Sequence, residues 1–316
     1  MKKNTLYYLL RANGDYVSGE EIAAKSSTSR MSVSKDVAAL RADGAVIESS
    51  TRCGYRLVTP PNTIYPETVK AFLSTGEDID VYCHKRIGST NEEAKKLAAE
   101  GAGHGTTVIA EEQTRGRGRY GRSFFSPYKS GIYMSVILRP SSQRTEVLYT
   151  VCAAVAVRRV LSRYNEKSKI KWVNDIYVND RKICGILCEA VSEMELGRLE
   201  AVICGIGVNL GKPEGDFPAD ISKKAGALTD SEVNRAKISA EIIKELLLVI
   251  EQDADDVVAE YEMNMMLISR RISYSQNGEL IRATVTGVDR TGGLVVTKDS
   301  GESCVLRSGE VHLESF

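Results

Sequence analysis

Residues 116–122 read GRGRYGR, and they follow a run that has the alternating pattern of a β-strand. Four arginines alternate with glycines between positions 115 and 122. A guanidinium group offers a planar set of donors that fits a phosphate or a carboxylate, and glycine lets the backbone approach a ligand closely. A mobile, solvated basic loop is the alternative, but this segment joins two predicted strands inside the chain. The pattern therefore favours a loop that closes over an anionic ligand.

The glycines of this loop also match G-x-G-x-x-G, which is typical of two kinds of nucleotide-binding protein. A dinucleotide site needs a helix directly after the loop and an acidic residue about twenty positions further on. The segment SFFSPYKSGIYMSVILRP has a proline and strand-like alternation instead, and its far end, RPSSQ, has no carboxylate. A protein kinase would have valine at the position of Ser123, and the chain has neither H-R-D nor D-F-G. We exclude both kinds of site.

A second polar segment, KWVND, lies on a predicted strand with apolar neighbours. Asn174 and Asp175 need hydrogen-bond partners there, because buried polar groups are nearly always paired. A ligand site and a cluster that only stabilises the fold are equally consistent with this pattern. Lys182 lies across a predicted turn, beside the apolar run ICGIL. A lysine beside such an apolar strand is normally a strand-edge residue that favours solubility.

Composition limits the class of protein. The 316 residues include 42 basic and 42 acidic side chains, so the net charge gives no general attraction to nucleic acid or membrane. A chain of this length is expected to form two or three domains. Its seven cysteines are expected to be reduced, and His84, His104 and His312 lack metal-ligand spacing to them, which argues against zinc. No run approaches the ~20 apolar residues of a membrane span, so we expect a soluble, cytoplasmic protein.

The first sixty residues have the pattern of a winged helix-turn-helix. LYYLL lies on a first helix, a second begins at Ser18 with Glu21 at capping-box spacing, and a third has Val33, Val37 and Leu40 at helical spacing. An alternating hairpin, AVIESSTRCGYRLV, follows. Nine Lys or Arg stand against six Asp or Glu in this region, which favours contact with DNA. Because the second motif helix faces base edges, the expected DNA-binding residues are Arg30, Ser32 and Lys35 on the helix and Arg52 and Arg56 on the wing.

Prolines in TPPNTIYP mark a boundary after the hairpin. From Val81 to Leu210 strands and helices alternate, with Thr90 and Glu93 at capping-box spacing, and IKWVNDIYV begins a meander of three strands. From Arg271 onward, short alternating runs broken by turns are typical of a small barrel. The expected fold is α+β with three domains: a winged helix-turn-helix at 1–62, a central domain on a mainly antiparallel sheet at 63–268, and an SH3-like β-barrel at 269–316.

Four segments occur in an order and at separations that closely resemble the biotin–protein ligases: GSTN, EEQTRGRGRYGRSFFSP, KWVNDIYVNDRKICGIL and GIGVNL. With the winged helix in front, essentially the whole chain resembles the bacterial family of bifunctional biotin ligases and biotin operon repressors. Two positions depart from the family pattern, since Phe124 replaces a usual tryptophan and Val173 a usual proline. Both replacements are apolar, so we expect adjusted packing and retained activity.

The resemblance implies an activity. The enzyme would use ATP and Mg²⁺ to form biotinyl-5'-AMP and would transfer biotin to a lysine of the biotin-carrier domain of a carboxylase. It would also bind operator DNA as a homodimer when the adenylate is bound, and so repress biotin genes. A transcription factor with a non-catalytic ligand-sensing domain is the alternative, although such a sensor should have lost Lys182 or the charged loop. A ligase for lipoate would not normally carry both this loop and a winged helix, and a ligase without DNA control stays open.

The resemblance also assigns roles to individual residues. The expected biotin-pocket residues are Ser89, Thr90, Asn91 and Gln113. The residues expected to close over biotin and the adenylate are Arg117, Gly118 and Arg119, and Lys182 would contact the biotin carboxylate and the reacting phosphate. The residues expected near the nucleotide are Lys171, Asn174 and Asn209. Asp175 would lie near magnesium, where it could also orient or deprotonate the incoming amine.

Overall fold

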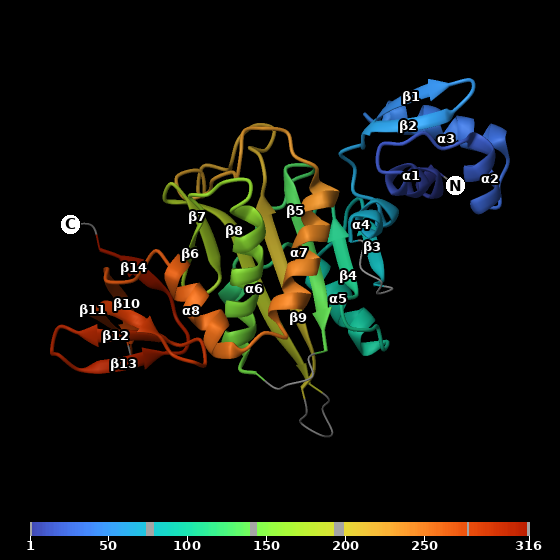
Figure 1. The fold of residues 1–316 in the computed structure, drawn as a ribbon. Helices are drawn as coiled ribbons and strands as arrows, with labels where there is room; N and C mark the ends of the chain where they lie inside the picture. The colour runs from blue at the N-terminus through green and yellow to red at the C-terminus, as the bar shows by residue number, and fades with distance from the viewer. Residues whose placement is uncertain (1, 74–78, 140–143, 193–198, 277, 315–316) are drawn as a thin grey trace.

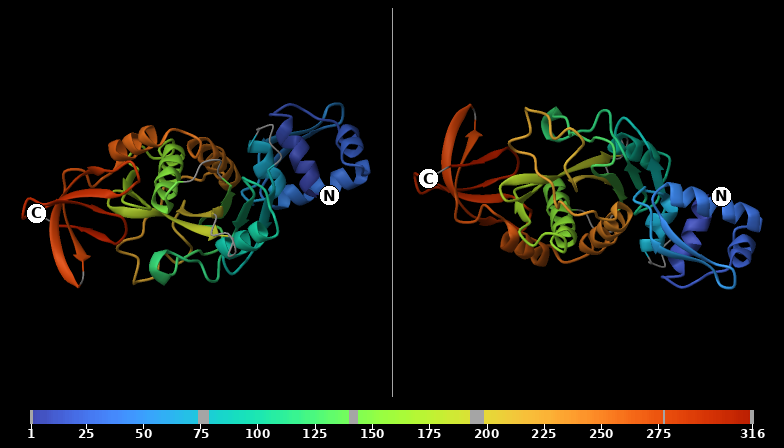
Figure 2. Two further views of the ribbon diagram at one scale, coloured as in Figure 1. Left: turned by 90° about the horizontal axis from the view of Figure 1, so that it is seen from below. Right: turned by 90° about the horizontal axis from the view of Figure 1, so that it is seen from above.

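The computed structural model describes residues 2–73, 79–139, 144–192, 199–276 and 278–314 (Figure 1). Two small units lie at opposite ends of a larger central domain, and each carries one end of the chain (Figure 2). None of the described helices is long and apolar enough to cross a membrane.

The N-terminal unit is the expected winged helix-turn-helix. Ser18 caps the second helix, because its hydroxyl accepts a hydrogen bond of 3.0 Å from the Glu21 amide. Ser29 caps the third helix in the same way and accepts from the Ser32 amide at 3.1 Å. The unit has its own apolar core, in which Leu40 is fully buried. Its elements are α1 (Lys2–Arg11), α2 (Gly19–Lys25), α3 (Arg30–Ala42), β1 (Val46–Ser50) and β2 (Gly54–Thr59).

The central domain is built on a seven-stranded sheet with the order β3-β4-β5-β9-β8-β7-β6. Among the strand pairs of the described residues, β3 and β4 alone are parallel, so the expected mainly antiparallel sheet is confirmed. The long strands β5 and β9 at the centre of the sheet are mostly apolar and buried, whereas their neighbour β8 is only partly buried. The strands are β3 (Val81–His84), β4 (Thr107–Ala110), β5 (Gly131–Leu138), β6 (Lys169–Lys171), β7 (Asp175–Val178), β8 (Arg181–Ser192) and β9 (Leu199–Asn209).

Helices cover both faces of this sheet (Figure 1). α6 (Glu146–Leu161) and α7 (Arg235–Val249) pack together over one face, and α8 (Ala254–Asn264) packs against α6. Most of α6 is buried, as its apolar sequence predicts. α5 (Thr90–Ala99) lies on the opposite face, where small residues such as Ala94 bring it close to the strands.

The C-terminal unit contains five antiparallel strands in the order β13-β12-β11-β10-β14. The expected small all-β domain is therefore present. No ladder among the described residues joins β13 to β14, so closure of the sheet into an SH3-like barrel stays a prediction. The strands are β10 (Arg271–Gln276), β11 (Glu279–Val288), β12 (Leu294–Lys298), β13 (Ser303–Leu306) and β14 (Val311–Leu313).

Two local predictions were wrong. Thr90 does not cap α5; Ser89 occupies the N-cap position without a capping hydrogen bond, and the Thr90 hydroxyl donates to Gln113 instead. The segment IKWVNDIYV is not one strand, because residues 172–174 form a turn between β6 and β7. Asn174 therefore lies in that turn, where its amide donates to the Ile186 carbonyl at 2.8 Å. In both places tertiary hydrogen bonds override the local pattern.

Two helices were missing from the sequence prediction. α4 (Pro66–Leu73) begins with the last proline of TPPNTIYP, at a position where proline suits a helix start. It packs between α1 of the winged helix and α7 of the central domain. The other is α8, capped by Asp253. α4 was missed because its first residue belongs to a proline-rich stretch that was interpreted only as a domain boundary.

Candidate active site

A cavity of about 700 Å³ opens beside the central sheet. Its wall combines the start of α5, the glycine-arginine loop, strands β5, β7, β8 and β9, the segment 217–225 and residues 309–312 of the C-terminal unit. Six cationic side chains line it against three carboxylates, which favours an anionic ligand. The lining includes all the predicted ligase-site residues: Ser89, Thr90, Asn91, Gln113, Arg117, Gly118, Arg119, Lys171, Asn174, Asp175, Lys182 and Asn209.

One end of the cavity is a neutral hydrogen-bonding pocket. The Gln113 amide oxygen accepts from the Thr90 backbone amide at 2.9 Å and from the Thr90 hydroxyl at 3.1 Å. The Gln113 amide nitrogen donates to Ser126 at 3.0 Å. Ser135 on β5 lies within hydrogen-bonding distance of both Thr90 and Asn91. These neutral donors and acceptors suit a polar, uncharged ligand group, and Ser135 is a member of the cluster that the sequence prediction missed.

A series of hydrogen bonds and ion pairs connects this pocket to the glycine-arginine loop. Asn91 donates to Glu189 at 2.7 Å, and Lys95 donates to the other oxygen of Glu189 at 2.8 Å. Lys95 also reaches Glu92 at 3.3 Å, and Arg117 pairs with the same Glu92 oxygen at 2.9 Å. Burial alone would raise the pKa of the Glu189 carboxyl, but the hydrogen bonds from Lys95 and Asn91 outweigh it and hold that pKa below its ordinary value. Glu189 was missed from the sequence, where it ends an apolar run.

The glycine-arginine loop is fixed to the C-terminal unit by its second half. Tyr120 has a left-handed backbone with φ 56°, and its hydroxyl accepts from the Gly309 amide at 2.9 Å. Arg122 forms a two-pronged ion pair with Glu310. Arg119 lies over the Tyr120 ring at 5.0 Å and reaches Asn174 at 3.4 Å. The loop thus stands between the central sheet and the C-terminal strands, with Arg119 directed at the KWVND turn.

The opposite side of the cavity carries a second group of charges. Lys182 pairs with Asp175 at 2.6 Å, and both side chains are partly exposed. Burial lowers the pKa of the nearby Lys171 ammonium, and the Asp175 charge opposes this effect. Lys182 is therefore not a free strand-edge lysine. It stands in the cavity beside the one carboxylate that was expected to hold magnesium.

The donor set can be tested against Mg²⁺. This ion is usually held by one or two carboxylates together with substrate phosphates and water. The described residues contain no group of three His, Cys, Asp or Glu side chains able to hold a metal by themselves. Asp175 supplies one carboxylate inside a cavity lined by cations that suit phosphates. This arrangement fits an ion that arrives with a nucleotide.

Glycines on β8 and β9 make room for the side chains of the site. A Cβ atom on Gly205 would lie 2.1 Å from the Asn91 amide oxygen, and one on Gly207 would lie 2.4 Å from the Phe124 ring. The Phe124 ring also lies beside Gly185 and packs edge-on against Tyr133 at 6.4 Å. The adjusted packing expected at Phe124 thus places a phenyl ring over two glycines of the cavity floor.

The predicted DNA-binding residues of the winged helix differ in exposure and in their partners. Lys35 is exposed on α3, and Arg52 is exposed in the wing turn. Arg30 pairs with Glu20 at 3.3 Å. Arg56 is held by Glu48 at 2.6 Å and stacks over the Tyr16 ring at 5.0 Å. Ser32 lies 3.0 Å from the capping Ser29 hydroxyl, so part of its hydrogen-bonding capacity is used inside the domain.

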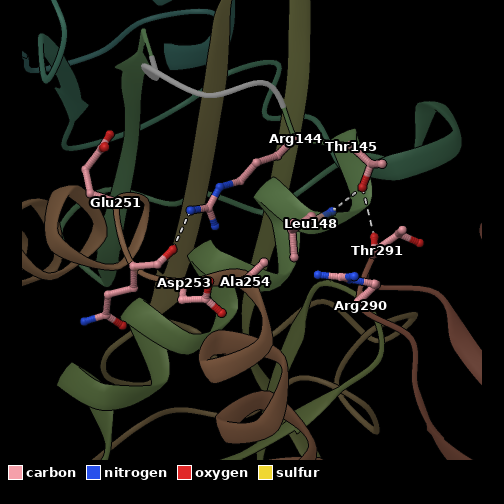
Figure 3. A pocket seen from close by; sticks show the side chains of 9 residues that line it. Arg144, Thr145, Leu148, Glu251, Asp253, Ala254, Arg290 and Thr291 are labelled. Carbon is pink, nitrogen blue, oxygen red and sulfur yellow. Dashed lines mark hydrogen bonds between the residues drawn. The ribbon is translucent and has the colours of Figure 1, made fainter.

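A second cavity, of about 560 Å³, shares no lining residue with the first (Figure 3). It lies where the start of α6 and the turn before α8 meet the C-terminal unit. Thr145 caps α6 and donates to the Thr291 carbonyl at 2.9 Å, and Arg144 donates to the Gln252 carbonyl. Arg290 pairs with Asp255 at 3.4 Å. The Thr145–Thr291 and Arg290–Asp255 contacts join the central domain to the C-terminal unit, whereas the Arg144–Gln252 bond lies within the central domain.

Comparison with known proteins identifies the family. The model of the Biotin/lipoate A/B protein ligase family matches residues 83–209, and a model of an HTH domain matches residues 2–56. The bifunctional ligase/repressor BirA of Bacillus subtilis is 34% identical over 80% of this chain and 78% of its own length. The chain belongs to the BirA family. BirA of Escherichia coli is 27% identical over 100% of this chain and 99% of its own length.

A solved structure supports the same fold for this BirA-family chain. The biotin protein ligase from Aquifex aeolicus in complex with biotin and ATP covers 74% of this chain and 98% of its own, with a TM-score of 0.63 and 23% identity. The residues matched by the ligase-family model include every predicted residue of the cavity. The residues matched by the HTH model include every predicted DNA-binding residue. The family expected from the four sequence segments is confirmed. The roles of the individual residues stay predictions.

Proposed function

We propose that this protein is an ATP-dependent biotin–protein ligase and a biotin-responsive transcriptional repressor. It forms biotinyl-5'-AMP from biotin and ATP with release of pyrophosphate, and it transfers the biotinyl group to a lysine amine of a biotin-carrier domain with release of AMP. The observation that carries the proposal is the single cavity in which a neutral pocket, a cationic loop and Lys182 meet. Biotin has a neutral polar ring system and one carboxylate, so its two ends match the two ends of this cavity.

In the first half-reaction the biotin carboxylate attacks the α-phosphate of ATP, so two anions must approach each other. Fixed cations aimed at the developing charge remove this repulsion. Arg117, Arg119 and Lys182 supply these charges. Arg117 exchanges its Glu92 partner for the ligand, and Lys182 exchanges Asp175 for the reacting oxygens. Lys171, Asn174 and Asn209 lie beside the nucleotide.

Asp175 is the residue that would hold Mg²⁺, and the phosphates of the nucleotide would be further ligands of the ion. The ion would neutralise phosphate charge when bound. Asp175 then orients or deprotonates the lysine amine of the carrier in the second half-reaction.

The adenylate has to stay shielded from water until the carrier arrives. The glycine-arginine loop provides this shield, and its attachment to Gly309 and Glu310 holds one side of it in place. Residues of the C-terminal unit therefore support the closed site. The remaining part of the loop, around Arg117 and Gly118, moves over the ligand.

The winged helix contacts operator DNA through Arg30, Ser32, Lys35, Arg52 and Arg56. The adenylate promotes a homodimer, whose two winged helices read two half-sites of the operator. One intermediate thus serves both the reaction and the repression.

The decisive experiment combines both activities in one sample. Transfer of radiolabelled biotin to a biotin-carrier domain is measured with ATP and Mg²⁺, and DNA binding is measured with and without biotin plus ATP. Transfer together with adenylate-dependent DNA binding is the expected result. DNA binding without transfer would favour a sensor, and transfer without DNA binding would remove the repressor role.

A further inference from the structure

A buried ion pair lies outside the candidate active site. Glu111 follows β4 and Arg235 begins α7, and their side chains are only 6% and 4% exposed. The Arg235 guanidinium donates directly to the Glu111 carboxylate. Charges buried to this extent require further hydrogen bonds to offset their lost hydration. The partners that supply those bonds show what the pair holds.

The further partners all come from the linker between the winged helix and the central domain, residues 60–65. Arg235 donates to the Asn62 side-chain oxygen at 3.2 Å and also to the Asn62 backbone carbonyl. The Ile64 amide donates to the second oxygen of Glu111 at 2.9 Å. The Ile64 side chain is buried in the core of the central domain. The ion pair thus binds the linker at two places, Asn62 through Arg235 and the Ile64 amide through Glu111.

The next linker residue is attached to the winged helix. The Tyr65 hydroxyl donates to the Asp43 carboxylate at 2.7 Å, and Asp43 is the C-cap of α3, the helix that carries Lys35. The Tyr65 ring packs against the core of the winged helix. Two adjacent linker residues therefore contact different domains: Ile64 contacts the central domain, and Tyr65 contacts the winged helix. A segment bound in this way cannot act as a free hinge.

We infer that the Glu111–Arg235 pair is a positioning element for DNA binding: it fixes the linker, and through Tyr65 it fixes the orientation of α3 on the central domain. In a dimer, this orientation sets the separation of the two DNA-reading helices. The protein then binds two half-sites strongly only at a matching spacing, because both sites must be engaged at once. The predicted preference for one half-site spacing rests on the repressor function proposed above. The predicted orientation of α3 on the central domain does not depend on that function.

The first test measures orientation without DNA. Spin labels are placed at the exposed positions 38 on α3 and 99 on α5, on a genetically encoded keto amino acid so that the native cysteines stay unlabelled. We expect one narrow distance distribution in the full chain. Arg235→Lys, which loses the forked contact to Asn62, and Tyr65→Phe, which loses the hydrogen bond to Asp43, should both broaden it. Tyr82→Phe, at an exposed tyrosine on β3, is the control and should leave it unchanged.

An unchanged narrow distribution in both variants would overturn the inference. If Arg235→Lys does not fold, Tyr65→Phe and Asn62→Ala decide by the same criterion. A merely structural role of the pair would lower the melting temperature of Arg235→Lys without broadening the distribution of the folded protein. That result also contradicts the positioning role.

The second test uses duplex DNA with two half-sites, selected from random sequence by the wild-type protein with biotin and ATP, at spacings increased by single base pairs. The wild type should prefer one spacing. The variants should bind that spacing about tenfold more weakly and should differ less between spacings, with biotin transfer unchanged. An equal loss at all spacings, or no loss, counts against the inference. If the wild type binds none of the duplexes, the repressor function fails, and the spin-label distances alone decide the positioning role.

Discussion

Glu189 acts on the candidate biotin pocket through other side chains. It fixes Asn91 and receives Lys95, and these two contacts connect the pocket to Glu92 and Arg117. A hydrogen bond to a charged group contributes about 1.5–3 kcal/mol. The position of Asn91 in the pocket therefore depends on its hydrogen bond to the Glu189 carboxylate.

The variant Glu189→Gln should bind biotin about tenfold more weakly, because the amide cannot receive both Asn91 and Lys95 as the carboxylate does. The KM for biotin should rise with little change in kcat. Steady-state transfer at varied biotin concentration measures this, with Glu100→Gln at the end of α5 as the control. An unchanged KM would show that Asn91 keeps its place without Glu189.

The same carboxylate gives a pH dependence of stability. The pKa of the Glu189 carboxyl is lowered in the folded protein. Its contribution to the free energy of unfolding is therefore complete above the ordinary pKa of glutamate, about 4.3. That contribution is lost as the pH falls through the lowered pKa of the folded state. The difference in unfolding free energy between wild type and Glu189→Gln should be constant from neutral pH down to that range and should shrink below it. Urea unfolding at a series of pH values measures the difference. A difference that grows with acid would contradict the assigned contacts.

Arg117 is expected to act both in adenylate formation and in retention of the adenylate. The variant Arg117→Ala should form the adenylate more slowly and should also release it early, because the loop loses its charge contact with the ligand. Chase experiments with unlabelled adenylate measure the release rate. Arg115→Ala is a matched control in the same loop, outside the cavity lining. Equal retention of adenylate by Arg117→Ala and wild type would remove Arg117 from the closing role.

At the scale of elements, strand β9 places two glycines where side chains from other elements must fit. The variant Gly205→Ala adds a Cβ atom at 2.1 Å from Asn91, so it should displace that side chain. Overpacking of this kind costs about 1–3 kcal/mol, and biotin affinity should fall by about tenfold or more. Gly211→Ala is the control, because a Cβ atom there has no neighbour within 4 Å. Calorimetric titration with biotin measures both, and equal affinities would contradict the described role of Gly205.

The order of elements was largely predictable from the sequence, whereas their ends were not. The winged helix and the antiparallel sheet follow from apolar periodicity, and Ser18 follows from capping chemistry. The break after β6 and the uncapped start of α5 arise from contacts with residues far along the chain, Asn174 with Ile186 and Thr90 with Gln113. Such contacts leave no trace in a local window of sequence.

The candidate site was predictable to the same degree. Residues in the loop and in KWVND have unusual types for their positions, so they could be singled out. Ser135 is a polar residue in the buried strand β5, and Glu189 lies between apolar residues of β8; only the fold shows that both contact Asn91. The contribution of Gly309 and Glu310 also needs the docking of the C-terminal unit, which no sequence pattern indicates.

At the scale of the whole molecule, the two activities should separate by domain. The variant Lys35→Ala removes an exposed charge from α3 and should weaken DNA binding. The loss should be about 1–3 kcal/mol for a contact to a base, and it should be uniform across sequences with a smaller salt dependence for a contact to a phosphate. Biotin transfer should not change. Lys237→Ala, at an exposed position on α7, is the control for loss of one surface charge. A parallel loss of transfer in Lys35→Ala would contradict the division of labour.

The attachment of the glycine-arginine loop to Gly309 and Glu310 also has a consequence for synthesis of the protein. The winged helix contains its whole core within the first 65 residues, so it can fold while the ribosome is still translating the rest. The cavity is lined by residues 309–312, which leave the ribosome after the whole central domain. A nascent chain thus acquires its DNA-reading domain early, and its ligase site is complete only after residues 309–312 have been translated.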